Sequence, residues 1–328
     1  ANIHIDLGSD QTSLHNPWAG GYYPVGLSFE EGEKMIAENL ELLLDLQRKN
    51  KVSFLYEASC CASIPIIRNL EEYYDNDLLT SIAGIFNGST NFILTKMLSE
   101  NRPYNEVLRE AQTLGFAESD PSLDVDGVDA KYKLCILLFH AFGLITAPEE
   151  VYNFGISRIN NFDMDYACKH GYSIKLLAKC EIVGTEIEAY CLPAFVDESD
   201  VLAQTKNEYN AVVLETAFSE SQLLYGKGAG DKPTGSAVLS DLSALNYGYK
   251  YEYKKFQNKA QTLSISQTTE LRLYVRYDNK APDAKDFIKV EESYQSEQGN
   301  FLIGWIRLDQ LRNARWMADK GTNIIQLT

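Results

Sequence analysis

The chain of 328 residues lacks the usual glycine fingerprint of a dinucleotide-binding domain, because no G-x-G-x-x-G follows a predicted strand anywhere in it. Its six cysteines also form no C-x-x-C pair, a spacing typical of zinc and redox motifs. Cys135 and Cys180 lie in largely apolar segments. We therefore expect free thiols in a reducing cytoplasm rather than a disulfide framework.

Long hydrophobic runs and positive charge are scarce as well. The longest apolar run, 134–145, is too short to span a bilayer and contains His140. The formal net charge of −16 argues against nucleic acid or an anionic membrane as a partner. Residues 1–6 lack the basic segment of a signal peptide, which agrees with a cytoplasmic location. A hydrophobic content of 45% and a charged content of 23% indicate a globular protein with a sizeable core.

Acidic residues, by contrast, are concentrated in one short stretch. Five carboxylates precede Lys133 there: Glu118, Asp120, Asp124, Asp126 and Asp129. Pro121 disfavours a helix through this acidic run and indicates a loop. Asp124 or Asp126 can cap a following helix that continues to Phe142, with Gly143 as its natural end.

Two interpretations of this helix compete. Asp129 and Lys133 are four residues apart and share one face, so they can form a solvated ion pair worth about 0.3–0.5 kcal/mol. However, residues 134–139 are all apolar, which indicates a mostly buried helix. Polar groups on a buried helix usually face a cleft or a partner, so we favour a functional cluster.

Three segments in order make the chain resemble the homoserine dehydrogenases. They are Phe54-Leu-Tyr-Glu-Ala-Ser-Cys-Cys-Ala-Ser-Ile-Pro-Ile-Ile-Arg68, Gly84-Ile-Phe-Asn-Gly-Ser-Thr-Asn-Phe-Ile-Leu-Thr-Lys96 and the acidic stretch from Gly115 to Lys133. A fourth match is the glycine-rich segment Gly226-Lys-Gly-Ala-Gly-Asp-Lys-Pro-Thr-Gly-Ser-Ala-Val238. The resemblance extends from about residue 34 to about residue 245.

The resemblance implies an enzyme of threonine and methionine biosynthesis. Its reaction is the reversible NAD- or NADP-dependent reduction of L-aspartate 4-semialdehyde to L-homoserine. Lys133 and Asp129 are the implied catalytic pair, because the carbonyl oxygen gains negative charge as hydride arrives and needs a proton donor or cation nearby. The implied substrate-binding residues are Glu118, Asp124, Gly88 and Ser89.

The same resemblance implies a cofactor site and a cation site. Gly228 and Gly230 occupy the family's loop that contacts the nicotinamide dinucleotide, and Lys34 retains the second lysine of an Asn-Lys-Lys run that here is Gly-Glu-Lys. Without the family context, a glycine-rich strand-to-helix turn explains that loop equally well. A sodium ion is implied at four positions of one turn: Glu57, Cys60, Ala62 and Ile64. Backbone carbonyls suit such a hard cation, although the family usually has glycines in this turn.

Residues 1–32 form a separate leader rich in Gly, Pro, Asn and Tyr. Within it, residues 8–25 resemble a stretch of urocanate hydratase that contacts bound NAD, with Gln11–His15 and Tyr22–Tyr23 at the matching positions. The matched part contains none of the residues that react with urocanate. A loop without its scaffold binds a dinucleotide poorly, so an exposed leader is the competing interpretation.

We expect an α+β fold with a mixed or antiparallel sheet, helices on one face, and a Rossmann part that is truncated or replaced. Strands are expected at 52–56 and 79–86 and, grouped late in the chain, at 185–191 and in a hairpin of 211–215 with 221–225. This grouping favours α+β over repeated βαβ units. The predicted domains are the leader 1–32, a catalytic domain 33–247 and a small α+β tail 248–328. Within the tail, 271–278 resembles the first strand of an ACT regulatory module.

Two functions from different classes follow. The first is a homoserine dehydrogenase-family enzyme that takes a small amino-acid substrate and forms a homodimer. The alternative is a substrate and dimerisation domain that is catalytically incomplete, since it lacks its own cofactor-binding domain. Binding of NADPH separates the two.

Overall fold

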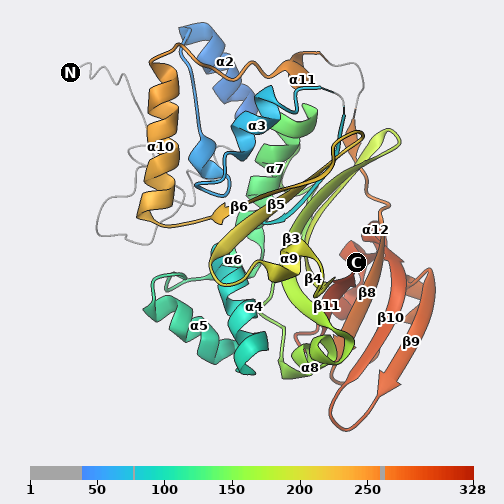
Figure 1. Ribbon diagram of the computed structural model, residues 1–328. Coiled ribbons are helices and arrows are strands. Elements are labelled where there is room, and N and C mark those ends of the chain that lie inside the picture. The colour runs from blue at the N-terminus through green and yellow to red at the C-terminus, as the bar shows by residue number, and fades with distance from the viewer. Residues whose placement is uncertain (1–38, 77, 259–262) are drawn as a thin grey trace.

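The computed structural model describes residues 39–76, 78–258 and 263–328. Lys34 and the leader therefore lie outside the described residues. Within the described part the chain has an α+β fold built on one mixed sheet of 11 strands, as the sequence predicts. Figure 1 shows this sheet as a curved surface, with most of the helices packed along one side.

The sheet has the order β6-β5-β1-β3-β4-β11-β8-β10-β9, with β2 and β7 paired to β4 at its side. Neighbours along this order are antiparallel except β4 and β11, which are parallel. The longest pair is the β3–β4 hairpin. The strands are β1 (Leu79–Ile85), β2 (Tyr152–Asn153), β3 (Tyr172–Val183), β4 (Glu186–Asp197), β5 (Tyr209–Thr216), β6 (Glu220–Lys227), β7 (Ser264–Ile265), β8 (Glu270–Tyr277), β9 (Lys289–Gln295), β10 (Asn300–Arg307) and β11 (Asn323–Leu327).

The longer helices lie before and between these strands. Of the helices in the described ranges, none is long and apolar enough to cross a membrane. The α-helices are α2 (Leu40–Asn50), α3 (Ile66–Glu72), α4 (Gly88–Glu100), α5 (Tyr104–Thr113), α6 (Ser122–Val125), α7 (Val128–Phe142), α8 (Asn161–His170), α9 (Val201–Gln204), α10 (Asp231–Leu245), α11 (Lys254–Gln257) and α12 (Leu308–Asn313). Short 3-10 turns occur at η1 (Glu57–Ser59), η2 (Ala284–Asp286) and η3 (Arg315–Ala318).

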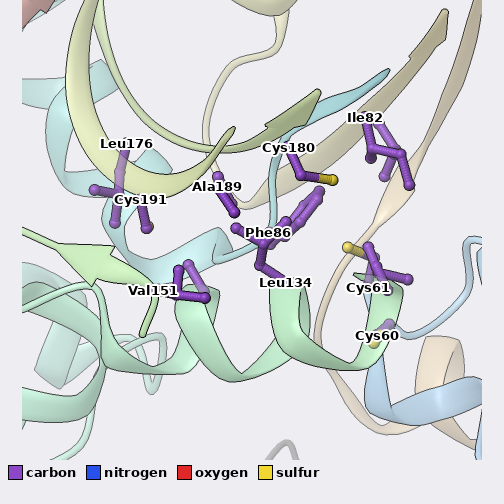
Figure 2. Packing of buried hydrophobic residues seen from close by; sticks show 14 of the residues in the cluster. Cys60, Cys61, Ile82, Phe86, Leu134, Val151, Leu176, Cys180, Ala189 and Cys191 are labelled. Atoms are coloured by element: carbon purple, nitrogen blue, oxygen red, sulfur yellow. The ribbon is translucent and has the colours of Figure 1, made fainter. Parts of the chain in front are cut away.

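The main core lies between α7 and the sheet. Figure 2 shows Leu134 of α7 beside Phe86, with Cys180 and Ala189 on the strands above them. All four are essentially inaccessible to solvent. The strand predicted at 185–191 is confirmed as part of β4, and its alternate residues Ile187, Ala189 and Cys191 all belong to this core. The short helix α9 packs on the opposite face of the sheet through Leu202 and Ala203, so the helices are not restricted to one face.

Three local predictions are corrected by the structure. Residues 52–56 form no strand, since no neighbouring strand pairs with them and Val52 is exposed. The acidic run is not a plain loop, because Pro121 precedes the short helix α6. The residue that caps α7 is Gly127 (φ 76°), not Asp124 or Asp126. The predicted end of α7 is confirmed, with Gly143 in the left-handed region (φ 68°).

The tail contributes strands to the same sheet. β11 lies between β4 and β8, so the last residues of the chain join the two halves of the sheet. Figure 1 shows β8, β9, β10 and β11 together at one end of the molecule, away from α2, α3 and α10. The ACT resemblance of the tail is not confirmed, and the domain boundary at 247 stays a prediction.

Candidate active site

The site begins where β1 passes into α4. Asn87 is the N-cap of α4, with an extended backbone (φ −128°, ψ 116°), and its side-chain oxygen accepts a hydrogen bond from the Thr90 amide at 2.9 Å. This is the usual way to satisfy the free amides at a helix start. The next position requires a glycine, Gly88, because the backbone passes close to another segment here. A Cβ would lie 2.7 Å from the Glu208 carbonyl oxygen.

The amide nitrogen of Asn87 contacts two carboxylates. It donates to Oδ1 of Asp124 on α6 at 2.7 Å and to Oδ2 of Asp129 on α7 at 2.8 Å. Both amide hydrogens and the amide oxygen of this side chain are therefore used. Asn87 is 6% exposed and Asp129 also 6%, so these hydrogen bonds form largely out of water.

Lys133 completes the arrangement. Its Nζ donates to Oδ2 of Asp129 at 2.7 Å and to the carbonyl oxygen of Phe86 at 3.2 Å. The Lys133 side chain is 13% exposed, so it is neither a surface charge nor fully enclosed. The solvated ion pair considered from the sequence is thus wrong, and the pair lies at the edge of the core. We call Asn87, Asp124, Asp129 and Lys133 the carboxylate–lysine cluster.

Burial sets the electrostatics of the cluster. Burial first and the nearby Asp129 carboxylate second raise the pKa of Asp124 to about 6, against the opposing effects of Asn87 and Lys133. Two carboxylates and one ammonium group leave an excess of negative charge. The arrangement therefore suits a ligand that carries an ammonium group together with an oxygen that can accept a proton from Lys133.

Of the other predicted substrate-binding residues, two adjoin Asn87 and the third lies on the loop after α5. Gly88 and Ser89 form the first turn of α4 next to Asn87, and the Ser89 hydroxyl donates to the carbonyl oxygen of Phe116. Glu118 follows on that same loop two residues later, and it is exposed. Its backbone oxygen accepts from the Gln112 amide at 2.9 Å, which fixes the loop at the end of α5.

The predicted cofactor glycines lie at the β6–α10 turn. A Cβ on Gly228 would come within 2.0 Å of the Asn210 amide, so this glycine is explained by packing alone. Gly230 differs, because it precedes α10 with φ 110° and a Cβ there would meet only Pro233, at 3.7 Å. The 15-residue helix α10 thus begins beside a backbone that a ligand can approach closely, although Asp231 puts a carboxylate in its first turn.

The side chains of the predicted cation turn are engaged elsewhere. Both oxygens of Glu57 accept amides at the start of α3, from Ile67 and Arg68, each at 2.8 Å. The Cys60 thiol, whose pKa burial raises, contacts the carbonyl oxygen of Lys133 at 3.8 Å. Ala62 has a left-handed backbone (φ 42°), a strained conformation for a non-glycine residue. The Glu57 carboxylate is thus committed to the start of α3, and the sodium site at this turn stays a prediction.

Sequence reasoning missed Asn87 and the Phe86 carbonyl as parts of the site. Asn87 has the local signature of a helix cap, which the structure confirms. Its second contact, with carboxylates 37 and 42 residues away, leaves no signal in the local pattern.

These residues form one polar site at the edge of the core, in which a lysine is held against one carboxylate, next to a second carboxylate and a helix start. The homoserine dehydrogenase family model matches residues 65–243, which include the whole carboxylate–lysine cluster. The homoserine dehydrogenase of Lactococcus lactis subsp. lactis (strain IL1403) is 34% identical over 280 residues, or 82% of this chain and 65% of that protein. The chain belongs to the homoserine dehydrogenase family.

Solved structures agree with this assignment. A homoserine dehydrogenase from Thiobacillus denitrificans has a TM-score of 0.78 at 28% identity, covering 90% of this chain and 75% of that one. A hyperthermophilic archaeal homoserine dehydrogenase mutant in complex with NADPH has a TM-score of 0.57 at 28% identity, covering 66% and 63%. The Urocanase Rossmann-like domain model matches residues 1–54, so that resemblance also reaches α2. Among the first curated relatives the chain spans between 47 and 65% of their length.

Proposed function

We propose that this protein carries out the reaction of its family, the reversible NAD- or NADP-dependent reduction of L-aspartate 4-semialdehyde to L-homoserine. The observation that supports it most is the position of Lys133, held between Asp129 and the Phe86 carbonyl beside a second carboxylate. An amino-acid aldehyde brings an ammonium group for the carboxylates and a carbonyl oxygen for the lysine.

In this proposal each member of the cluster has one task. The Lys133 ammonium donates a proton to the substrate oxygen as the carbonyl carbon is reduced, and in reverse the amine accepts that proton. Asp129 holds Lys133 in place through the 2.7 Å contact. Asp124 and Glu118 receive the substrate ammonium, and the backbone at Gly88 and the hydroxyl of Ser89 border the bound amino acid.

A nicotinamide cofactor supplies the hydride when bound. Gly230, with its open approach at the start of α10, fits close contact with a dinucleotide, whereas Gly228 supports that loop by packing on Asn210. Lys34 stays a proposed cofactor contact. The solved relative in complex with NADPH supports this type of cofactor, and the choice between NAD and NADP is an outcome of the test.

Titration with NADPH, followed by its fluorescence, separates the two candidate functions. Micromolar binding together with oxidation of L-homoserine by NAD⁺ or NADP⁺ supports the enzyme. No binding at millimolar NADPH supports the alternative, a substrate and dimerisation domain without its own cofactor site. The same assay with added sodium tests the proposed cation turn at Glu57, Cys60, Ala62 and Ile64: a rate that is independent of sodium would remove that site.

We also infer a cytoplasmic homodimer. The edge strand β6 presents Leu223 and Tyr225, which are 43% and 54% exposed, on a face that a second copy can cover. All six cysteines are free thiols, and five of them are buried, which suits a reducing compartment. Sedimentation of the wild type and of Tyr225→Glu tests the dimer, because a charge on this face should yield the monomer.

A further inference from the structure

We propose that Asn87 is the positioning residue of this site: its one amide nitrogen holds Asp124 and Asp129 at a fixed separation and thereby orients Lys133. This inference deepens the proposed function and rests on it for the kinetic part of its test. The helix cap formed by the same side chain is a separate role, and the two roles can be tested apart.

The geometry of the two hydrogen bonds carries the inference. Asp124 belongs to α6 and Asp129 to α7, and the two helices meet at Gly127 in a left-handed conformation. Two carboxylates this close repel each other, and a neutral donor between them offsets part of that repulsion. The Asn87 amide donates to both carboxylates at 2.7 and 2.8 Å, so their spacing is set from a third element, the start of α4.

Asn87 reaches Lys133 through a shared oxygen. Oδ2 of Asp129 accepts from Asn87 and from Lys133 Nζ, and Lys133 also donates to the carbonyl of Phe86, the residue next to Asn87. The Phe86 carbonyl therefore holds Lys133, and the Asn87 side chain holds Asp129, the carboxylate that pairs with this lysine. The helix cap also orients the Asn87 side chain. The Thr90 amide donates to the Asn87 side-chain oxygen and so fixes the plane of the Asn87 amide group.

Two substitutions test the bridging of Asp124 and Asp129 separately from the capping of α4. Asn87→Asp keeps the size and the capping oxygen but removes both donors and adds a third carboxylate. Asn87→Ser also retains a capping oxygen but is too short to bridge two carboxylates. Both variants should fold. We expect kcat for L-homoserine oxidation to fall on the order of 10²-fold in each, the size of effect that a small misplacement of catalytic groups produces.

The titration of Asp124 supplies a readout that does not depend on turnover. The groups that face Asp124 are Asp129, Asn87, Lys133 and Ser89. Of these, Asn87 stabilises the ionised form, so its loss should raise the pKa of Asp124, and more in Asn87→Asp than in Asn87→Ser. Carbon NMR of the aspartate carboxyls measures this in the wild type and both variants.

The matched control is Asn160→Asp, the same change at the N-cap of α8, where the Asn160 side chain accepts the Phe162 and Asp163 amides. Its kcat and its Asp124 titration should equal those of the wild type. If both Asn87 variants fold with unchanged kcat and an unchanged Asp124 midpoint, Asn87 is only a helix cap and the proposal is wrong. If the wild type itself does not oxidise homoserine, the proposed function fails while the Asp124 titration still decides the role of Asn87.

Discussion

At the scale of single residues, Lys133 is the side chain on which the proposed chemistry depends most. Lys133→Ala should lower kcat by about 10²–10⁴-fold, the usual contribution of general acid–base catalysis, because the developing alkoxide loses its proton donor. The substrate affinity should change little, since the carboxylates that bind the ammonium remain. Steady-state kinetics with L-homoserine measures both.

Lys131→Ala is the control for that change, because it truncates another lysine on α7 outside the carboxylate–lysine cluster. The Lys131 ammonium lies over the Tyr132 ring, 5.9 Å from its centroid. Its kcat should stay within about twofold of the wild type. An unchanged rate in Lys133→Ala itself would discard the assignment of this lysine.

Asp124 should link the pH dependence of activity with that of stability. Its folded pKa of about 6 lies above the value of 3.8 for a free aspartate. The native state therefore binds more protons than the unfolded state between these two values. The stabilisation that the protonated group contributes is fully present below pH 3.8 and is lost as the pH rises through 6.

Asp124→Asn should consequently be more stable than the wild type at pH 8, by about 1 kcal/mol, and this difference should shrink at pH 5. Its KM for homoserine should rise roughly tenfold, because a neutral amide binds the ammonium less well than a carboxylate. Urea unfolding at the two pH values and a pH profile of KM test this. A wild-type KM that does not rise as the pH falls through 6 would contradict the role of Asp124.

The sequence predicted that Asp124, Asp129 and Lys133 gather in one charged cluster, because their spacing and the apolar run behind them are local features. It could not identify Asn87 as a bridge, since that role depends on how α4, α6 and α7 meet in space. Nor could it show that Gly228 is needed for packing on Asn210. Local patterns mark which residues carry charge, whereas tertiary contacts decide which of them meet.

At the scale of elements, a buried polar network joins α3, α7 and the segment before α11. His140 of α7 contacts Tyr56 Oη through Nε2 at 2.7 Å and Glu71 of α3 through Nδ1 at 2.6 Å. The second oxygen of Glu71 accepts the Tyr253 amide at 2.9 Å. All of these side chains are buried, so the network is fully satisfied only as a whole.

Glu71→Ala should therefore destabilise the protein by roughly 3 kcal/mol, because it leaves the Tyr253 amide and His140 without their acceptor and opens a cavity. The midpoint of urea unfolding, with its slope, measures this effect. Glu252→Ala is the control: that residue is an exposed neighbour of Tyr253, and its change should stay within about 0.5 kcal/mol. Equal stability of the two variants would show that the network contributes nothing.

The elements that the sequence predicted best are those with strong periodicity or clear ends, such as α7, β1, β4 and the β5–β6 hairpin. The strand β9 was missed because all of its residues are exposed and no apolar alternation marks it. The segment 52–56 was wrongly assigned as a strand because its apolar residues, such as Phe54, pack on the core without any strand beside them.

At the scale of the whole molecule, the unpredicted feature is the position of β11 in the middle of the sheet. Its pairing with β4 joins segments about 130 residues apart, and no turn or spacing in the chain indicates it. A buried ion pair supports the same junction. Arg276 of β8, whose side chain is 5% exposed, donates to Asp163 of α8 at 3.1 Å, and Asp163 also accepts the Asn323 amide of β11 at 3.0 Å.

Arg276→Leu should weaken the whole molecule, by about 3–5 kcal/mol, because it leaves the Asp163 carboxylate buried without its cation. Arg272→Leu is the control on the same strand, since Arg272 pairs with Glu291 at a side chain that is 41% exposed. Its effect should stay below about 1 kcal/mol. Denaturant unfolding of both variants gives the comparison.

The same experiment shows whether the tail is an independent unit. In a Trp18→Phe background the remaining tryptophans are Trp305 and Trp316, so fluorescence reports the tail while far-UV circular dichroism reports the whole chain. Because β11 lies between β4 and β8, the tail cannot unfold without breaking the central sheet. The two signals should therefore share one midpoint, which Arg276→Leu lowers for both together. A fluorescence transition that precedes the dichroism transition would instead mean that residues 248–328 fold as a separate domain.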